Sequence, residues 1–193
     1  MTAATAERET TGAAFRDRQA FEAALSDRCL QSLYAFWRAR ADVRGVMPRA
    51  ALEPAALVAA LPNLFIMGLG PDGRFRYRLV GTRIHDHIGG RIDGLTVEEV
   101  RRGPLVDHLN ALFGTAAATP AAGFGLSTLE GESSPIAVYR RLVLPMSTDG
   151  DKVDQLVGAW SVTIETPDAS LLKSLAFPSP REAPGALMFL KPS

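Results

Sequence analysis

The segment 61–94 constrains the fold more than any other part of this chain. It reads LPNLFIMGLGPDGRFRYRLVGTRIHDHIGGRIDG, with an apolar run at 64–68 and a Gly-Pro-Asp-Gly turn at 70–73. The residues after the turn alternate strictly between apolar and basic: Phe75, Tyr77 and Leu79 against Arg74, Arg76 and Arg78. Two such runs joined by turn residues predict a β-hairpin. Because successive side chains of a strand point to opposite faces, we expect the arginines to occupy a solvent-facing side.

The rest of the chain adds helices around this hairpin and then three more strands. Apolar residues recur at helical spacing over about 15–40, before the hairpin. After it come short helical turns and a longer helix that begins at Pro104. Strand patterns follow at 123–129, 136–146 and 153–164. Consecutive strands with tight turns favour an antiparallel sheet, so we expect an α+β fold with five strands, helices on one face and an amphipathic N-terminal helix.

Composition narrows the classes of function. The 193-residue chain is 47% apolar, which is enough for a core, and it has equal numbers of basic and acidic residues, 21 each. The resulting net charge of zero gives no bulk attraction to nucleic acid or to an anionic membrane. Cys29 is the single cysteine, so neither an internal disulfide nor a cysteine zinc site is expected. No signal-peptide core and no membrane-spanning apolar run is visible, which favours a cytoplasmic protein.

Several phrases in the chain resemble one known family. They are LYAFWRAR (33–40), LPNLFI (61–66), FRYRLVGTRI (75–84), GRIDG (90–94) and YRRLVLPMS (139–147). In this order, they resemble PAS domains, and more narrowly the short bacterial proteins built around a single PAS domain and formerly catalogued as a domain of unknown function. The resemblance covers the chain from about residue 30 to 164. It implies a PAS-like sheet used in signal transduction, where it binds a ligand or a partner protein and does no chemistry itself.

On this basis we divide the chain into four parts. Residues 1–14 are small and polar and are expected to be disordered, and residues 15–60 form an N-terminal helical extension. The PAS-like domain spans residues 61–166. Residues 167–193 are expected to form an irregular tail, because its prolines disfavour regular structure.

A PAS-like domain implies a pocket between the sheet and its helices. The side chains predicted to line this pocket are Phe65, Phe75, Tyr77, Phe124, Leu126, Arg140, Leu142 and Trp160. For the aromatic members, the alternative is a packed core without a cavity. Alternation puts Arg140 on the same face as Leu142 and Leu144, where a buried guanidinium needs a carboxylate or an anionic ligand. We favour a structural ion pair for Arg140, or a β-bulge that turns it outward.

The three histidines are candidate ligands for a metal or a haem. His85 and His87 are two residues apart, so on a helix they point in different directions, and we predict a solvent-facing turn and no metal site. His108 lies on the long helix from which oxygen-sensing PAS domains supply their axial haem ligand. The resemblance therefore makes haem an alternative cofactor, although we favour a surface or helix-capping histidine.

The predicted N-terminal helix carries an apolar stripe that includes Leu33, Phe36 and Trp37. Because such a stripe must be buried, these residues are candidates for a homodimer interface or for docking a signalling partner. A small-molecule ligand beside the sheet would shift this helix, and the output would act in trans. The alternatives are an adaptor without a ligand and an enzyme with a small-molecule pocket. No nucleophile elbow, phosphate-binding loop or zinc-protease motif is present, which disfavours the enzyme.

Overall fold

The computed structural model describes residues 13–130, 135–164 and 182–191. The strands are β1 (Ala13–Phe15), β2 (Met47–Pro48), β3 (Leu64–Leu69), β4 (Phe75–Val80), β5 (Ala122–Glu130), β6 (Pro135–Ser147), β7 (Gln155–Ile164) and β8 (Glu182–Leu190). The α-helices are α1 (Arg18–Ala24), α2 (Arg28–Arg38), α3 (Thr82–Ile88), α4 (Val97–Val100) and α5 (Pro104–Ala118). Short 3-10 helices between β2 and β3 are η1 (Arg49–Ala51), η2 (Pro54–Leu57) and η3 (Leu61–Asn63). None of the helices in the described ranges is long and apolar enough to cross a lipid bilayer.

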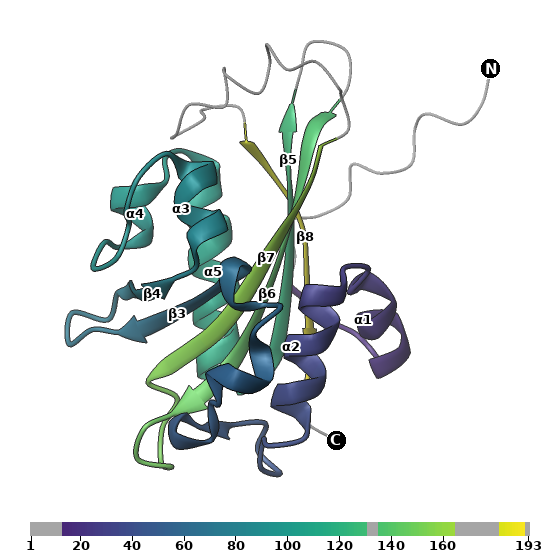
Figure 1. The fold of residues 1–193 in the computed structure, drawn as a ribbon. Helices are drawn as coiled ribbons and strands as arrows, with labels where there is room; N and C mark the ends of the chain where they lie inside the picture. The colour runs from purple at the N-terminus through teal and green to yellow at the C-terminus, as the bar shows by residue number, and fades with distance from the viewer. Residues whose placement is uncertain (1–12, 131–134, 165–181, 192–193) are drawn as a thin grey trace.

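The strands form one twisted sheet (Figure 1). Five of them make an antiparallel block in the order β5-β6-β7-β3-β4, which contains the strands predicted from the sequence. This block is extended, because β8 pairs antiparallel with β5 and β1 pairs parallel with β8. β2 adds a short parallel pairing to β6. The α+β class is confirmed, but the sheet has eight strands instead of the expected five.

The additional strand β8 comes from the tail that was expected to be irregular. Its proline, Pro184, lies opposite Ser127, next to a register shift between Gly125 and Ser127. Proline lacks the amide hydrogen that a regular ladder needs, but it is tolerated beside such an irregularity. Residues 165–181 lie outside the described part of the chain, so the prediction for them is not tested. At the other end, β1 includes residues 13–14 of the segment expected to be disordered.

The predicted hairpin forms, and a bulge changes the faces of its second strand. β3 pairs antiparallel with β4, and Gly73 adopts the left-handed conformation (φ 76°) in the turn between them. The register shifts after Ile66, so Arg78 has no residue opposite it on β3. As a result, Leu79 is 44% exposed and Val80 is buried, which corrects the prediction that Leu79 shares the buried side of the strand.

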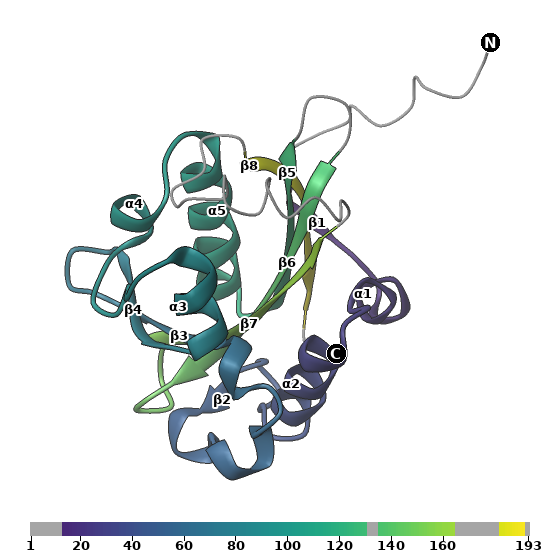
Figure 2. The same ribbon diagram turned by 45° about the horizontal axis from the view of Figure 1, so that its top comes forward.

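Helices cover both faces of the sheet, and each face carries its own core (Figure 2). We call the face under α3, α4 and α5 the α5 face, and the face under α1, α2 and the 3-10 helices the α2 face. Strand β7 shows the alternation, since Leu156 and Trp160 belong to the first core whereas Val157 and Ala159 belong to the second. The prediction of helices on one face is therefore corrected, because the N-terminal extension packs onto the sheet.

Residues 15–40 contain two α-helices where the sequence predicted one. Asp17 caps α1 by accepting a hydrogen bond from the backbone of Ala20, and Asp27 caps α2 by accepting one from the backbone of Cys29. Each cap starts a new helix, so the chain can change direction between them. The side chains of α2 that are buried on the sheet are Leu30, Leu33, Tyr34, Phe36 and Trp37.

On the opposite face, two glycines of β5 let α5 approach the sheet closely. A Cβ atom on Gly125 would lie 2.8 Å from a methyl carbon of Leu112 on α5, and one on Gly123 would lie 3.0 Å from the same side chain. Either contact is shorter than ordinary van der Waals packing allows, so a larger residue here would push the helix outward. Helix and strand are thus in direct contact at this point.

Candidate functional site

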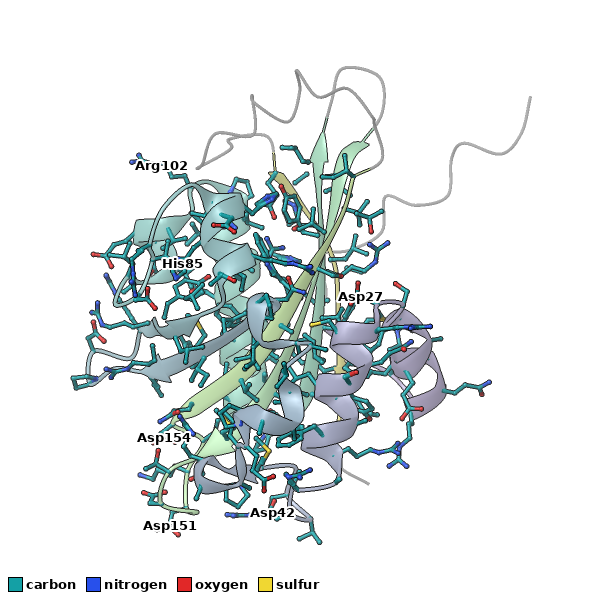
Figure 3. All side chains as sticks on the ribbon, viewed as in Figure 1. Asp27, Asp42, His85, Arg102, Asp151 and Asp154 are labelled. Atoms are coloured by element: carbon teal, nitrogen blue, oxygen red, sulfur yellow. The ribbon has the colours of Figure 1, made fainter. Side chains whose placement is uncertain are left out.

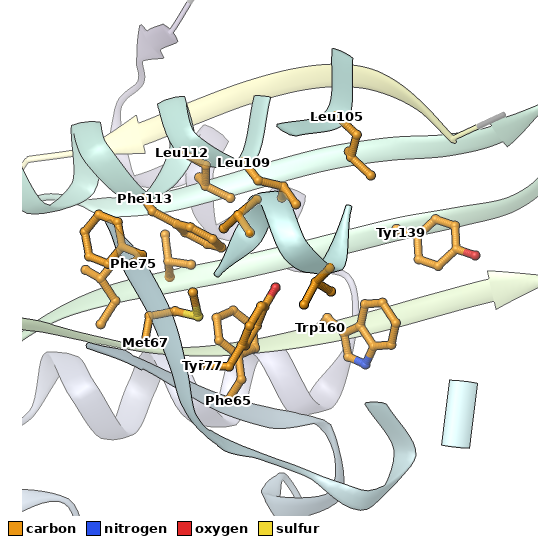
Figure 4. Close-up of a cluster of buried hydrophobic side chains, with 14 of the residues drawn as sticks. Phe65, Met67, Phe75, Tyr77, Leu105, Leu109, Leu112, Phe113, Tyr139 and Trp160 are labelled. Carbon is orange, nitrogen blue, oxygen red and sulfur yellow. The ribbon is translucent and has the colours of Figure 1, made fainter. Parts of the chain in front are cut away.

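The eight side chains predicted to line a pocket lie on two different faces. Those on the α5 face are Phe65, Phe75, Tyr77 and Trp160, and all four are buried (Figure 4). Those packed in the α2-face core are Phe124, Leu126 and Leu142. Arg140 shares the side of Leu142 by strand alternation. The alternation itself was predicted correctly, but the sequence did not indicate which set of side chains would face α5.

Aromatic rings fill much of the space between α5 and the sheet. The centroid of the Phe113 ring lies 6.2 Å from that of Phe65 and 5.9 Å from that of Phe75. The rings of Phe65 and Tyr77 meet edge-on with their centroids 6.2 Å apart. These separations are typical of packed aromatic clusters. This part of the predicted pocket is therefore a core in the described structure.

The buried arginine of β6 is Arg141, the neighbour of the predicted Arg140. The guanidinium of Arg140 lies near the surface and donates a hydrogen bond to the hydroxyl of Thr163 (2.9 Å). Arg141 points to the α5 face and is only 4% exposed. The prediction of an inward-facing arginine thus applies to the wrong member of the pair, because the Arg140 side of the strand is exposed at this position.

Arg141 belongs to a group of buried polar side chains that we call the ion-pair cluster: Arg101, Ser127, Arg141 and Glu182. Nη2 of Arg141 lies 2.6 Å from Oε1 of Glu182, and Glu182 is the first residue of β8. The Ser127 hydroxyl donates to the same oxygen (2.6 Å) and accepts from Nη1 of Arg141 (2.5 Å). Nη1 of Arg101, from the loop before α5, lies 3.7 Å from the other oxygen, Oε2. One carboxylate is therefore held by two guanidiniums and a hydroxyl.

The electrostatics keep this carboxylate ionised. Burial by itself would raise the pKa of Glu182, but attraction to Arg141 and Arg101 and the hydrogen bonds from Ser127 and Arg141 lower it overall. Burial also lowers the pKa of Arg101, and Glu182 opposes that change. Removing a charged pair from water costs free energy, and each buried charge is stabilised by its partner. The loss of either charge would therefore leave the other uncompensated.

Aromatic and imidazole rings surround the two guanidiniums. The Cζ atom of Arg141 lies 5.2 Å from the ring centroid of Tyr139 and 5.7 Å from that of Trp160, and Cζ of Arg101 lies 6.0 Å from the Trp160 ring. These distances are within the range of cation–π attraction. Nε2 of His87 lies 3.0 Å from the Tyr139 hydroxyl. Burial and the nearby Glu182 raise the pKa of Tyr139 to about 12, so its hydroxyl keeps its proton.

His108 lies on α5 near the cluster and is buried, which corrects the expectation of a surface or capping histidine. Burial, followed by repulsion from Arg141, lowers its pKa to about 4, so the ring is neutral near pH 7. The backbone of Leu126 lies near the ring, but neither ring nitrogen has a hydrogen-bonding geometry to any residue that the structure describes.

The surroundings of His108 do not fit a haem. Its Nε2 would lie 3.5 Å from a Cβ atom on Gly125, and the Leu112 side chain one turn further along α5 also touches this strand. A porphyrin would have to separate the helix from the sheet. We therefore derive no role for a haem group.

The other two histidines, His85 and His87, lie on α3. Figure 3 labels His85. His85 pairs with Asp93, with Nε2 3.2 Å from Oδ2, and its Nδ1 lies 3.1 Å from the carbonyl oxygen of Gly90. His87 is half-buried and meets Trp160 edge-on, with the ring centroids 5.1 Å apart. Both rings therefore have specific contacts, instead of the fully solvent-facing positions that were predicted.

A surface cavity opens beside this region. It has a volume of about 460 Å³ and is lined by Asp27, Asn63, Arg83, Asp86, His87, Trp160, Ser161 and Val162. Two of these residues, His87 and Trp160, also contact Tyr139 of the interior. The cavity thus leads from solvent to the rings that cover the ion-pair cluster.

The three interface candidates of the N-terminal helix are buried within this chain. Leu33, Phe36 and Trp37 all belong to the core of the α2 face. The indole Nε1 of Trp37 donates a hydrogen bond to the carbonyl oxygen of Pro145 on β6 (2.9 Å). The apolar stripe is therefore covered by the chain's own sheet, and whether it also serves association stays a prediction.

Sequence reasoning missed all four members of the ion-pair cluster, since it selected Arg140 in place of Arg141. Arg101 stands in a loop, Ser127 in a strand judged by its apolar side chains, and Glu182 in the proline-containing tail. One signal was available: if Arg140 shares a face with Leu142, then Arg141 faces the other side together with Tyr139. The partner carboxylate is far away along the chain, so no local pattern identifies it.

Comparison with known proteins agrees with this architecture. The family model described as PAS domain matches residues 25–161, more than half of the chain. No curated protein matches the chain closely enough to add a relative. The matched range contains three of the four cluster residues and leaves out Glu182. The chain therefore belongs to the PAS domain family, whose members are in general sensory or regulatory domains.

Proposed function

We propose that this protein is a non-catalytic PAS sensor of a small molecule. Binding on the α5 face changes how the segments outside the antiparallel block, β8 and α2, pack on the sheet. That change alters association with a second copy of the chain or with a signalling partner.

The observation that carries the proposal is the buried ion pair between Arg141 and Glu182. Arg141 belongs to the antiparallel block, whereas Glu182 begins a strand outside the range that matches the family. A molecule that changed the surroundings of Arg141 would therefore act on β8 directly. Removing one partner of such a buried pair leaves the other charge without compensation, which is destabilising. Loss of the contact to Arg141 should therefore weaken the packing of β8.

The helix α2 is linked to β6 on the other face of the sheet. Trp37 donates its hydrogen bond to Pro145 of β6, the strand that also carries Arg141. The sheet is one layer thick here, so a shift of β6 reaches both cores. This contact supports α2 as a second segment that responds to binding.

The test compares freshly purified protein with the same protein after denaturation and refolding. Native mass spectrometry is expected to find a noncovalent small molecule in the first sample and a bare chain in the second. Hydrogen exchange should then differ in residues 28–38 and 182–190, and light scattering should report a different average mass. Identical exchange and mass in a loaded and a stripped sample would overturn the proposal.

A ligand-free adaptor is the second candidate, and the aromatic packing under α5 favours it. The rings of Phe65, Phe75 and Phe113 occupy the space that a bound molecule would need. For an adaptor, native mass spectrometry would give the bare chain from the start. Binding to a partner protein would then be the same before and after refolding.

A further inference from the structure

The carboxylate of Glu182 is bound by the side chains of the other three cluster residues, Arg101, Ser127 and Arg141. We propose that Arg101, Ser127 and Arg141 form a binding site for a small carboxylate, and that Glu182 occupies this site in the resting state. A free carboxylate that enters the site displaces Glu182 and loosens the start of β8. This inference rests on the proposed function and names its ligand class.

The composition of the site supports a carboxylate. The three groups that hold Glu182 all come from the matched PAS range, and the carboxylate alone comes from outside it. Arg141 donates from Nη2 to Oε1 of the carboxylate and from Nη1 to Ser127, and Arg101 approaches the other carboxylate oxygen, Oε2, so each oxygen faces a guanidinium. The site is therefore already shaped for the chemical group that the chain places in it.

His108 offers a further polar contact beside this site. Its ring is 2% exposed and is subject to the charges of Arg141 and Glu182, and the backbone of Leu126 lies near it without meeting hydrogen-bonding geometry at either ring nitrogen. Buried polar atoms in native proteins almost always have a partner. A ligand with a second polar group, such as a hydroxyl, could provide one.

The surface cavity gives such a molecule an approach. Its wall includes Trp160, whose ring contacts both guanidiniums, and His87, which packs edge-on against that ring. Asp27, Asp86 and Arg83 lie at the same cavity, so its mouth carries both signs of charge. The flat rings of Trp160 and Tyr139 next to the guanidiniums favour a flat carboxylate, and benzoate is the probe we choose.

Displacement has a defined starting point in β8. Glu182 is its first residue, and the pairing with β5 is irregular nearby, between Gly125 and Ser127. Further along, Leu187 and Phe189 are buried in the α5-face core and hold the strand in place. Release therefore begins at 182–184 and leaves the far end paired.

The experiment measures benzoate binding by calorimetry in four proteins. Without the internal competitor, Glu182→Ala should bind benzoate about tenfold more tightly than the wild type, or better. Arg141→Lys, which keeps the charge and loses the paired donors, should bind it at least about tenfold more weakly. Arg140→Gln, one residue away on the same strand, is the matched control and should bind like the wild type. Glu182→Gln replaces Glu182→Ala if that variant does not fold.

Three results would overturn the inference. They are equal benzoate affinity in the wild type and the Glu182 variant, unchanged affinity in Arg141→Lys, and binding of inorganic phosphate as tight as that of benzoate. In the wild type, saturating benzoate should also speed hydrogen exchange at the backbone amides of Glu182 and Ala183, and unchanged exchange there would reject displacement. If benzoate fails while a copurified molecule still alters exchange in β8, the proposed function stands and the carboxylate site is rejected.

Discussion

The two faces of the sheet are covered in different ways. On the α2 face, the helices pack through apolar side chains, and Trp37 adds a hydrogen bond to the backbone of Pro145. On the α5 face, an aromatic core continues into buried charges at Arg101, Arg141 and Glu182. Apolar packing depends little on pH, whereas the ionisation of a buried carboxylate and its partners depends on it. This difference is the reason why we propose that the α5 face responds to a chemical signal.

The largest effect is expected from the ion-pair cluster. Glu182→Ala leaves the guanidiniums of Arg101 and Arg141 without the carboxylate that both approach, and should lower the free energy of unfolding by about 3–5 kcal/mol. Arg140→Gln removes a guanidinium near the surface and should cost less than about 1 kcal/mol. Urea unfolding of both variants checks the contrast. Equal losses of unfolding free energy in the two variants would show that the buried cluster contributes no more to stability than an arginine near the surface.

On the α2 face, a change of similar size should have a different character. Leu33 belongs to α2 and is fully buried against the sheet. Leu33→Ala should therefore lower the free energy of unfolding by about 2–5 kcal/mol, through lost packing and the cavity left behind. Its neighbour Ser32 is exposed, and Ser32→Ala is the control. Thermal unfolding at low and high salt should give the same loss for Leu33→Ala. A strong salt dependence would contradict the apolar description of this face.

The pH dependence should come from the α5 face. His108 has a pKa of about 4 in the folded chain and about 6.5 when unfolded, so between these values the unfolded state binds the extra proton. The free energy of unfolding should therefore fall as the pH drops through this window, by up to about 3 kcal/mol. Glu182 acts in the same direction at lower pH, because its folded pKa is also lowered.

The substitution His108→Leu tests this assignment. The variant should lose less stability than the wild type between about pH 6.5 and 4, because it has no imidazole to protonate on unfolding. Urea unfolding at several pH values measures the two slopes, and His85→Gln, which changes a surface ion pair with Asp93, is the control. Parallel slopes for wild type and His108→Leu would refute the role of His108.

The same comparison explains what the sequence could predict. Local patterns identified the hairpin, the block of five strands and the α5 helix, because turn residues and periodicity act over a few positions. Alternation placed Arg140 on the side of Leu142, but the buried arginine is Arg141 on the other side. What alternation does not contain is which face a distant helix will cover, and that choice decided the positions of Phe124, Leu142 and Arg140. Glu182 depends on a strand pairing between residues more than fifty positions apart, which no local signal records.

A substitution with a smaller expected effect on stability allows the two faces to be compared by fluorescence. Trp37 and Trp160 are the two tryptophans of the chain, and they lie on opposite faces of the sheet. Trp37→Phe removes the hydrogen bond to Pro145 and should cost about 1 kcal/mol. It also leaves Trp160, in contact with both cluster guanidiniums, as the single tryptophan that reports fluorescence.

A benzoate titration then separates the responses of the two faces. In Trp37→Phe, the emission of Trp160 should change strongly, because the ligand enters beside its ring. In Trp160→Phe, the emission of Trp37 should change by less, because the signal must cross β6 to reach α2. If Trp160 does not respond, no carboxylate enters on the α5 face. If Trp160 responds and Trp37 does not, β8 alone carries the change, and the part assigned to α2 is wrong.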